Sequence, residues 1–377
     1  MNRALFFYGT LCHIPLLEIV LGRSGAEIDI SEALLPDHLV SWVKDEPFPM
    51  IAAHPRGRAR GILVQDLSPQ DVDRLRFYEG GFEYDLTSVA VELSAGRNAQ
   101  AEVFFPEVGV WSAGAEWVLD DWIAEWGRVS EAAAREVMEH YGKRSVDEVA
   151  RLLPFFRARG WAKQLAQETA PTSLRRDTSS ADVTLKPTGD GFAEFFRLDT
   201  FELSYPRFDG TQSETLQRSA FVAYDAALVL PYDPKNDLVM LIEQLRYGPL
   251  MRGDPKPWVL EPIAGLVDAG EPPMEAARRE AVEEAGIDLR DIRPMMKVYP
   301  SPGYSTEFFH CFLGICALDL AMEGTHGLAS ENEDIRTHVI SFDRAMALVD
   351  SGEINLAPTT MMLLWIARHR ESLRANA

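Results

Sequence analysis

The sequence predicts a mixed fold of class α+β or α/β, divided into two domains. The chain has 377 residues, which is more than one ordinary hydrophobic core accommodates. Segments patterned like strands and like helices alternate along both halves. Residues 170–181 are polar, contain a proline and show no periodicity, which is typical of a linker. We therefore expect one domain over 1–127, a helical segment with the linker over 128–181, and a second domain over 182–377.

The first half combines strands with helices. A buried strand followed by a turn opens it, and another strand begins at Arg58 and ends at Leu67. Ser68 is predicted to cap a helix that continues to about Tyr78, because a serine side chain accepts backbone hydrogen bonds at a helix start and Pro69 suits the first turn. The other elements expected here cover residues 3–11, 13–22, 84–93, 100–106, 115–126 (a packed tryptophan face) and 128–169.

The second half also alternates strands and helices. Ala226–Leu230 and Leu238–Ile242 are apolar runs joined by a polar turn that contains Pro234, so they predict a β-hairpin. Strand-like segments precede this hairpin. The remaining elements expected here are a helix over 274–285, strands near 295–299 and 307–315, and a last helix over about 358–370.

Composition restricts the function. Hydrophobic residues make up 46% and charged residues 25%, as in soluble globular proteins. The formal net charge of −21 disfavours a nucleic-acid partner, because the polymer backbone is itself anionic. No apolar stretch is long enough to span a membrane, and the early apolar run is too short for a signal peptide, so we expect a cytoplasmic protein. Three cysteines without C-x-x-C spacing predict neither a disulfide framework nor a zinc site.

One segment of the second half contains acids, an arginine and glycines at the spacing of a catalytic motif. It reads GLVDAGEPPMEAARREAVEEAGI, from Gly265 to Ile287, with a small Ala281 at an apolar position. The predicted helix begins after two prolines, and Gly286 follows its end, where a left-handed cap suits glycine. The residues that define the motif are Gly265, Glu271, Arg279, Glu280, Glu283, Glu284, Gly286 and Ile287.

The acids of this segment share one helix face. Glu280, Glu283 and Glu284 are spaced i, i+3 and i+4, and three like charges there would repel one another without compensation. A hard dication accepts such oxygen ligands. An isolated pair of acids at this spacing is usually a solvated surface, but that reading leaves the flanking glycines and Arg279 unexplained. We expect Arg279 to pair with the acids and orient them, and Glu275 to pair with Arg279.

This segment resembles the signature of the Nudix hydrolases at every fixed position. The resemblance covers about residues 183–372 and implies an α/β/α sandwich with a mixed sheet. Pro302, fifteen residues after Ile287, and the stretches 241–246 and 327–336 resemble the ADP-ribose pyrophosphatase branch. The resemblance implies a Mg²⁺-dependent enzyme, with Mn²⁺ as a substitute. Its substrate would be ADP-ribose, and its products AMP and ribose 5-phosphate.

The same resemblance implies roles for individual residues. The backbone carbonyl of Ala264 and the side chains of Glu280, Glu284 and Glu333 would hold the metal. Glu331 would activate or position the attacking water, with Glu283 and Arg279 as further catalytic groups. Members of this branch are typically homodimers. The substrate would be bound by Arg246 and Arg218, by Phe195 and Phe196 (which could equally belong to an ordinary core), and by Pro302.

The first half resembles γ-glutamylcyclotransferase-like (AIG2-like) domains over about residues 3–127. The carrying residues are Tyr8, Gly9, Thr10 and Leu11 after the first strand, and Glu79 after a helix. The resemblance implies a small β-barrel with helices, in which the Tyr8–Leu11 backbone binds a γ-glutamyl group and Glu79 moves a proton. The fusion as a whole resembles Nudix proteins associated with tellurite resistance, a phenotype that specifies no chemistry.

Two alternatives to ADP-ribose hydrolysis stay open. The substrate could be another nucleoside diphosphate derivative, such as a nucleotide sugar or a dinucleotide, because no motif fixes the residues that face the base. The second half could also bind nucleotides without hydrolysing them, although loss of a motif glutamate would be expected then, and none is lost. The first half could be a weak γ-glutamyl cyclotransferase or a binding module.

Overall fold

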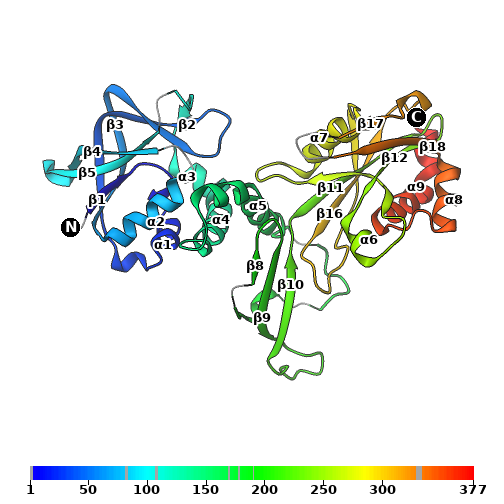
Figure 1. Cartoon of the computed structure of the whole chain (residues 1–377), viewed down its shortest axis with the longest axis horizontal. Helices are drawn as coiled ribbons and strands as arrows, with labels where there is room; N and C mark the ends of the chain where they lie inside the picture. Colours follow the sequence, from blue (N-terminus) through cyan, green and yellow to red (C-terminus); the bar gives the residue numbers. More distant parts are fainter. Residues whose placement is uncertain are drawn as a thin grey trace. The chain divides into compact units, whose positions relative to one another are not determined.

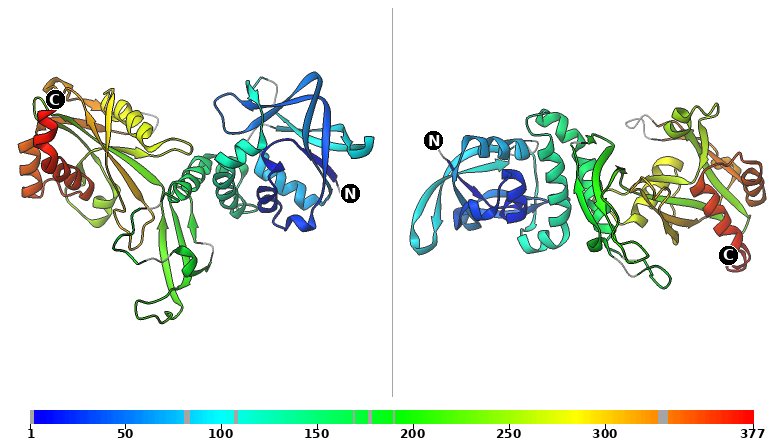
Figure 2. Two further views of the ribbon diagram at one scale, coloured as in Figure 1. Left: turned by 180° about the vertical axis from the view of Figure 1, so that it is seen from behind. Right: turned by 90° about the horizontal axis from the view of Figure 1, so that it is seen from below.

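The chain divides into two compact units, Met1–Glu168 and Thr169–Ala377. The structure is a computed structural model, and it describes all residues except 1–2, 81–83, 107–108, 169, 177–178, 190 and 328–332. Figures 1 and 2 show the ribbon of both units. In the described part of the chain, no helix has the length and apolar character needed to cross a membrane.

The first unit is built around a closed sheet. Its strands follow the order β3-β1-β5-β4-β2-β6, and β2 also pairs with β3, which closes the barrel. The pairing of β1 with β5 is parallel, whereas β1 pairs with β3 antiparallel. The predicted small barrel is therefore confirmed. The strands are β1 (Arg3–Phe7), β2 (Asp29–Val43), β3 (Pro49–Leu67), β4 (Tyr84–Leu93), β5 (Asn98–Pro106) and β6 (Ala113–Glu116).

Alternation along β1 separates two parts of the core. Phe6 and Tyr8 lie in the cluster that fills the barrel. Leu5 and Phe7 lie in the cluster that packs against the helices, because successive strand residues point to opposite faces. The end of β1 therefore lies where barrel and helices meet. The helices are α1 (Ile14–Leu21), α2 (Pro69–Glu79), α3 (Leu119–Trp122), α4 (Arg128–Glu139) and α5 (Val146–Leu165), with a π-helical turn at Ile123–Gly127 and 3₁₀ turns at Thr10–Cys12, Gly25–Glu27 and Ser94–Gly96.

The start of α2 follows the prediction. The Ser68 hydroxyl accepts the Asp71 backbone N–H at 3.1 Å, and the Asp71 carboxylate accepts the Ser68 N–H at 2.8 Å. This reciprocal capping box satisfies two backbone donors at the helix start. The strand expected over 58–67 is only the second part of β3, which begins at Pro49.

The second unit contains a mixed eight-stranded sheet, as predicted. Its path is β15-β16-β11-β12-β18-β17, with β13 paired to β12 and β14 to β11. Only β11 and β16 run parallel among these pairs. A smaller sheet joins β10, β9, β7 and β8. The strands are β7 (Thr184–Pro187), β8 (Phe192–Ala193), β9 (Arg197–Ser204), β10 (Leu216–Val222), β11 (Asp225–Asp233), β12 (Leu238–Leu245), β13 (Trp258–Glu261), β14 (Ile263–Leu266), β15 (Asp291–Val298), β16 (Phe308–Ile315), β17 (Thr325–His326) and β18 (Ile335–Ser341).

Helices cover both faces of the large sheet. Leu228 and Leu230 of β11 pack with Phe342 of α8 and Met362 of α9. Ala227 and Val229 alternate with them and point to the other face, where α7 packs on β11. Figure 1 shows this three-layer arrangement, with α7 apart from α8 and α9. The helices are α6 (Tyr247–Arg252), α7 (Pro273–Ala285), α8 (Phe342–Ser351) and α9 (Ala357–Ala375), with a 3₁₀ turn each at Ser180–Asp182 and Leu320–Met322.

Candidate active site

The acids of the catalytic motif lie on α7. This helix begins after Pro272, and it ends at Gly286, whose φ of 64° is the left-handed conformation expected from the sequence. Four alanines at its core-facing positions let the helix approach the sheet closely. Glu280 and Glu284 share that side of the helix and are 9% and 2% exposed. Two carboxylates are therefore buried where α7 meets the sheet.

Gly265 makes room for one of these carboxylates. It lies on β14, and a β-carbon at this position would stand 1.9 Å from Oε1 of Glu280. Any larger residue would displace Glu280. Next to it, the backbone N–H of Ala264 donates to Oε2 of Glu284 at 2.9 Å. The glycine that opens the motif is thus required by the packing of β14 against the acids.

Arg279 organises the acids, as expected. Its guanidinium contacts Glu271 at 3.0 Å, Glu280 at 2.6 Å and Glu283 at 2.9 Å. It also donates to the carbonyl of Leu266 at 3.0 Å. These bonds outweigh the effect of burial and raise the pKa of Arg279, so that the group stays cationic.

The prediction that Glu275 pairs with Arg279 is wrong. Its carboxylate lies 3.3 Å from Nε of Arg278, one position along the helix from Arg279. Arg279 instead turns toward Glu271, in the loop before α7. That loop acid is preferred because it allows two parallel hydrogen bonds, from Nε and Nη2 to the two carboxylate oxygens.

The charges of the buried acids are only partly compensated by the groups around them. Burial raises the pKa of Glu280 to about 7, although Arg279 acts against the shift. Burial raises the pKa of Glu284 to about 8, with the charges of Glu280 and Glu333 adding to the effect. Removing a carboxylate from water disfavours its charged form unless a cation is near. A positive charge bound between these groups would lower both pKa values.

Arg246 brings a further cation to this region. It follows β12, and its Nη2 lies 2.7 Å from Oε2 of Glu261 on β13. Burial acts to lower its pKa, but the bonds to Glu261 and the charges of Glu261, Glu284 and Glu333 outweigh that effect and raise it. Arg246 in turn opposes the pKa rise that burial causes at Glu307. With 41% of its side chain exposed, Arg246 keeps a face open to an anionic ligand.

The donor set suits a hard divalent cation. The carboxylate of Glu284 lies beside the backbone of Ala264, that of Glu280 lies beside the adjacent Gly265, and the charge of Glu333 acts on both acids. Oxygen ligands of this kind bind Mg²⁺ or Mn²⁺. Among the described residues, however, no three His, Cys, Asp or Glu side chains form a ready metal cluster. Glu331, the expected base, lies outside the described residues.

The other expected substrate residues lie outside α7, on β10, in the loop between β15 and β16, and between β8 and β9. Arg218 on β10 is exposed and donates to the carbonyl of Gln217. Pro302 lies in the exposed loop between β15 and β16. Phe195 and Phe196 are 41% and 45% exposed, so they are not an ordinary core pair. Their rings pack on each other and on Tyr224 and Phe221.

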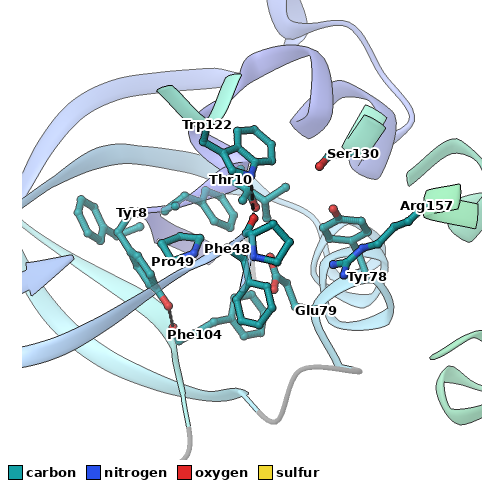
Figure 3. A pocket seen from close by; sticks show the side chains of 15 residues that line it. Tyr8, Thr10, Phe48, Pro49, Tyr78, Glu79, Phe104, Trp122, Ser130 and Arg157 are labelled. Atoms are coloured by element: carbon teal, nitrogen blue, oxygen red, sulfur yellow. Dashed lines mark hydrogen bonds between the residues drawn. The ribbon is translucent and has the colours of Figure 1, made fainter. Parts of the chain in front are cut away.

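The first unit holds a separate pocket at the end of β1. Tyr8, Gly9, Thr10 and Leu11 line it together with Glu79, and about 680 Å³ of space there is free of atoms, part of it open to solvent. Figure 3 shows Glu79 among Thr10, Phe48 and Tyr78. A β-carbon at Gly9 would stand 2.6 Å from Cγ of Pro49. The sequence thus brings these predicted residues into one cavity.

Glu79 is the last residue of α2 and does not project into open solvent. Burial raises the pKa of its carboxyl to about 7. Burial also raises the pKa of the neighbouring Tyr78 hydroxyl, with the charge of Glu79 adding to the shift. A carboxyl with a pKa near neutrality can both accept and donate a proton at physiological pH.

Comparison with known proteins assigns the second unit. The family model "NUDIX domain" matches residues 223–359. A protein named ADP-ribose pyrophosphatase from Escherichia coli O6:H1 is 38% identical over 180 residues, which is 48% of this chain and 85% of that protein. The chain belongs to the Nudix family. Its Nudix unit is therefore a Nudix hydrolase.

Further relatives of the Nudix unit carry two different names. An ADP-ribose pyrophosphatase from Haemophilus influenzae is 34% identical over 219 residues, 57% of this chain and 97% of that protein. A GDP-mannose pyrophosphatase from Escherichia coli O1:K1 is 30% identical over 172 residues, 46% of this chain and 88% of that protein. The first unit matches the family model "Gamma-glutamyl cyclotransferase, AIG2-like" over residues 5–122.

Sequence reasoning missed three charged residues. Glu261 and Glu307 flank Arg246, and Arg157 lines the pocket of the first unit. Glu261 could have been found from the sequence, because it directly follows the apolar run Trp258–Leu260. An acid at the end of such a run is often buried, and a buried acid requires a partner. Arg157 lies in a helix with several other charges, and only the tertiary structure distinguishes it.

Proposed function

We propose that the Nudix unit hydrolyses ADP-ribose to AMP and ribose 5-phosphate with Mg²⁺. The observation that carries the proposal is the pair of buried carboxylates, Glu280 and Glu284, held by Arg279 and the backbone of β14. Two relatives named for ADP-ribose, matched over 85% and 97% of their lengths, favour that substrate. The relative named for GDP-mannose shares less identity.

In this reaction water attacks one phosphorus, and the bond from that phosphorus to the bridging oxygen breaks. A bound Mg²⁺ would supply positive charge that neutralises the phosphates and acidifies the attacking water. Glu280, Glu284, Glu333 and the Ala264 carbonyl would hold it. Arg279 fixes Glu280 and Glu283 in place, and Arg246, oriented by Glu261, offers its open face to a phosphate.

Glu331 is the proposed base or water-positioning group. A carboxylate in this role takes up the proton of the attacking water, a contribution to the chemical step rather than to substrate binding. Glu331→Gln should depress kcat with little change in KM. An unchanged kcat would transfer the role to Glu333 or to a motif glutamate.

The substrate is tested by steady-state hydrolysis of ADP-ribose, GDP-mannose and a dinucleotide with Mg²⁺, with products identified by chromatography. We expect kcat/KM for ADP-ribose to be at least about tenfold higher than for the others, since a site built to bind one terminal group leaves polar atoms unpaired with another. A clear preference for a nucleotide sugar or dinucleotide would refute the substrate and leave the Nudix family assignment intact.

The proposed domain boundary is tested with a fragment. A chain that starts at Asp182 keeps all strands and helices of the large sheet and begins just before β7. We expect it to fold and to retain the pyrophosphatase activity of the full chain within about threefold, because loops and linkers contribute little to a domain's own core. Insolubility or loss of activity would mean that the first unit completes the fold or the dimer.

We also propose that the Nudix unit forms a homodimer and that the protein is cytoplasmic. The exposed rings of Phe195 and Phe196 lie between β8 and β9 of the small sheet, and apolar exposure of this kind favours association. Sedimentation velocity of the full chain and of Phe196→Ser tests the dimer, and a monomeric wild type would refute it.

For the first unit we propose a retained cyclotransferase-like cavity with at most weak γ-glutamyl cyclisation. The favouring observation is that Glu79 lies in one pocket with Tyr8–Leu11. The measurement is 5-oxoproline release from γ-glutamyl amines and dipeptides, by wild type and Glu79→Gln. We expect release near background for both. Robust release that Glu79→Gln abolishes would contradict the weak activity and make the protein bifunctional.

A further inference from the structure

A second cavity adjoins the pocket of the first unit. It lies among α2, α4 and α5 and encloses about 550 Å³ of atom-free space, part of it open to solvent. Its walls are mostly apolar, with Phe77 from α2, Ala133 and Val137 from α4, and Val149 and Leu153 from α5. The helices α4 and α5, which form most of these walls, follow the residues 5–122 that match the family model.

The helices α4 and α5 belong to the first unit. His13, at the start of α1, lies 2.9 Å from the carboxylate of Glu131 on α4. Ala133, Val137, Val149 and Phe156 form a buried cluster against which Phe77 and Tyr78 of α2 pack. The cavity walls are therefore fixed by the same core that holds Glu79 at the end of α2.

The two cavities share three residues: Tyr78, Ser130 and Arg157 line both. In the view of Figure 3, Arg157 and Tyr78 lie on the side of the pocket away from Tyr8 and Pro49. The first cavity is polar near Thr10 and Glu79, and the second is apolar. Arg157 and two hydroxyls therefore mark the junction of a polar and an apolar compartment.

Among the described residues, no carboxylate forms an ion pair or a hydrogen bond with the guanidinium of Arg157. Burial lowers its pKa, and the charges of Tyr78 and of the more distant Glu46 act against that shift without outweighing it. Arg159, two positions along the same helix, is fully buried but bonds both oxygens of Glu136, at 2.7 to 3.2 Å. A guanidinium stays protonated in proteins, so a partly buried one without a carboxylate favours an anionic ligand.

We propose that the two cavities form one ligand site, which binds a small amphipathic carboxylate. Its carboxylate group pairs with Arg157 and accepts hydrogen bonds from Tyr78 and Ser130. Its apolar body lies between α4 and α5, and a polar head, where present, faces Thr10 and Glu79. This binding does not depend on the pyrophosphatase activity of the Nudix unit or on turnover in the first unit.

The test is calorimetric titration of the full chain with four probes. The probes are γ-glutamylphenylalanine, its carboxamide without the terminal carboxylate, γ-glutamylglycine without the apolar group, and octanoate without the head. We expect γ-glutamylphenylalanine to bind at least about tenfold more tightly than the carboxamide and γ-glutamylglycine, because each lacks one recognised group. If octanoate binds more tightly than γ-glutamylphenylalanine, the carboxylate that the site recognises belongs to a fatty acid.

Two variants and a control locate the site. Arg157→Gln removes the cation, and Ala150→Trp fills the apolar cavity from an exposed rim position that leaves the core unchanged. Each should weaken binding of the best probe at least about tenfold. Arg151→Gln should leave binding unchanged, because this residue of the same helix is exposed and, within the described part of the chain, bonds to the backbone carbonyl of Asp147 alone. A midpoint temperature of thermal unfolding equal to that of the wild type verifies that each variant is folded.

Several results would overturn the proposal. They are the absence of binding for all four probes at millimolar concentration, equal affinity for the dipeptide and its carboxamide, and unchanged affinity in folded Arg157→Gln. ADP-ribose hydrolysis by the same samples is measured in parallel. Because it depends on the Nudix unit, its success or failure is separate from the outcome for this site.

Discussion

Glu284→Gln is expected to lower kcat for ADP-ribose hydrolysis at least about 100-fold, because a carboxylate that binds the metal stabilises the transition state directly. Glu284 is 2% exposed, and its Oε2 accepts the Ala264 N–H. Glutamine keeps the shape and can still accept that bond, so the loss measures charge rather than packing. Steady-state kinetics with saturating Mg²⁺ provide the measurement.

Glu275→Gln is the matched control on the same helix. Its carboxylate is half exposed and, among the described residues, pairs with Arg278 alone, so kcat should stay within about twofold. Removal of Mg²⁺ with EDTA should abolish turnover in the wild type, and Mn²⁺ should restore it. Full activity in EDTA, or an unchanged kcat in Glu284→Gln, would exclude the proposed metal role.

Measuring the stability of Glu284→Gln distinguishes a loss of activity at the site from unfolding of the protein. A buried carboxyl whose pKa is raised from 4.5 to about 8 favours the protonated form in the folded state. Its effect on stability is therefore most favourable below pH 4.5 and becomes progressively unfavourable as pH rises to about 8. In metal-free buffer at pH 8, Glu284→Gln should be at least as stable as wild type. A strongly destabilised variant would show that the carboxylate has a structural role.

Local sequence was sufficient to predict the motif helix. Pro272, Pro273 and Gly286 act on the backbone within one turn, so the bounds of α7 followed from neighbours alone. The same holds for the Ser68–Asp71 capping box. Contacts of Arg279 were only partly predictable, because Glu271 and Glu275 both lie within reach in sequence and the path of the loop decides between them.

Long-range contacts were not predictable. Arg246 and Glu261 meet because β12 and β13 pair, and one sequence contains no signal for that register. The long strand β2 was also missed. A register shift between Pro36 and His38, with Asp37 at a φ of 55°, interrupts its alternation, so the two parts read as irregular sequence. Arg157 lines the pocket of Glu79 because α5 packs beside it, and this packing cannot be deduced from the residues of α5 alone.

Gly265→Ala should reduce kcat about 100-fold although it alters no ionisable group. The new β-carbon would stand 1.9 Å from Oε1 and 2.1 Å from Cδ of Glu280, so the carboxylate must move. Movement would break the 2.6 Å contact with Arg279 and misplace a proposed metal ligand. Displacements of about 1 Å in a catalytic group commonly cost about 100-fold in rate.

Gly248→Ala is the matched control for this substitution. Gly248 lies in α6 of the same unit, and a β-carbon there meets nothing within 4 Å. Alanine also favours the helical conformation, so kcat and thermal stability should be unchanged or slightly improved. Apparent affinity for Mg²⁺, from the concentration dependence of the rate, should weaken in Gly265→Ala only. Wild-type kcat and Mg²⁺ dependence in Gly265→Ala would mean that Glu280 can move without cost, and its proposed place among the metal ligands would be wrong.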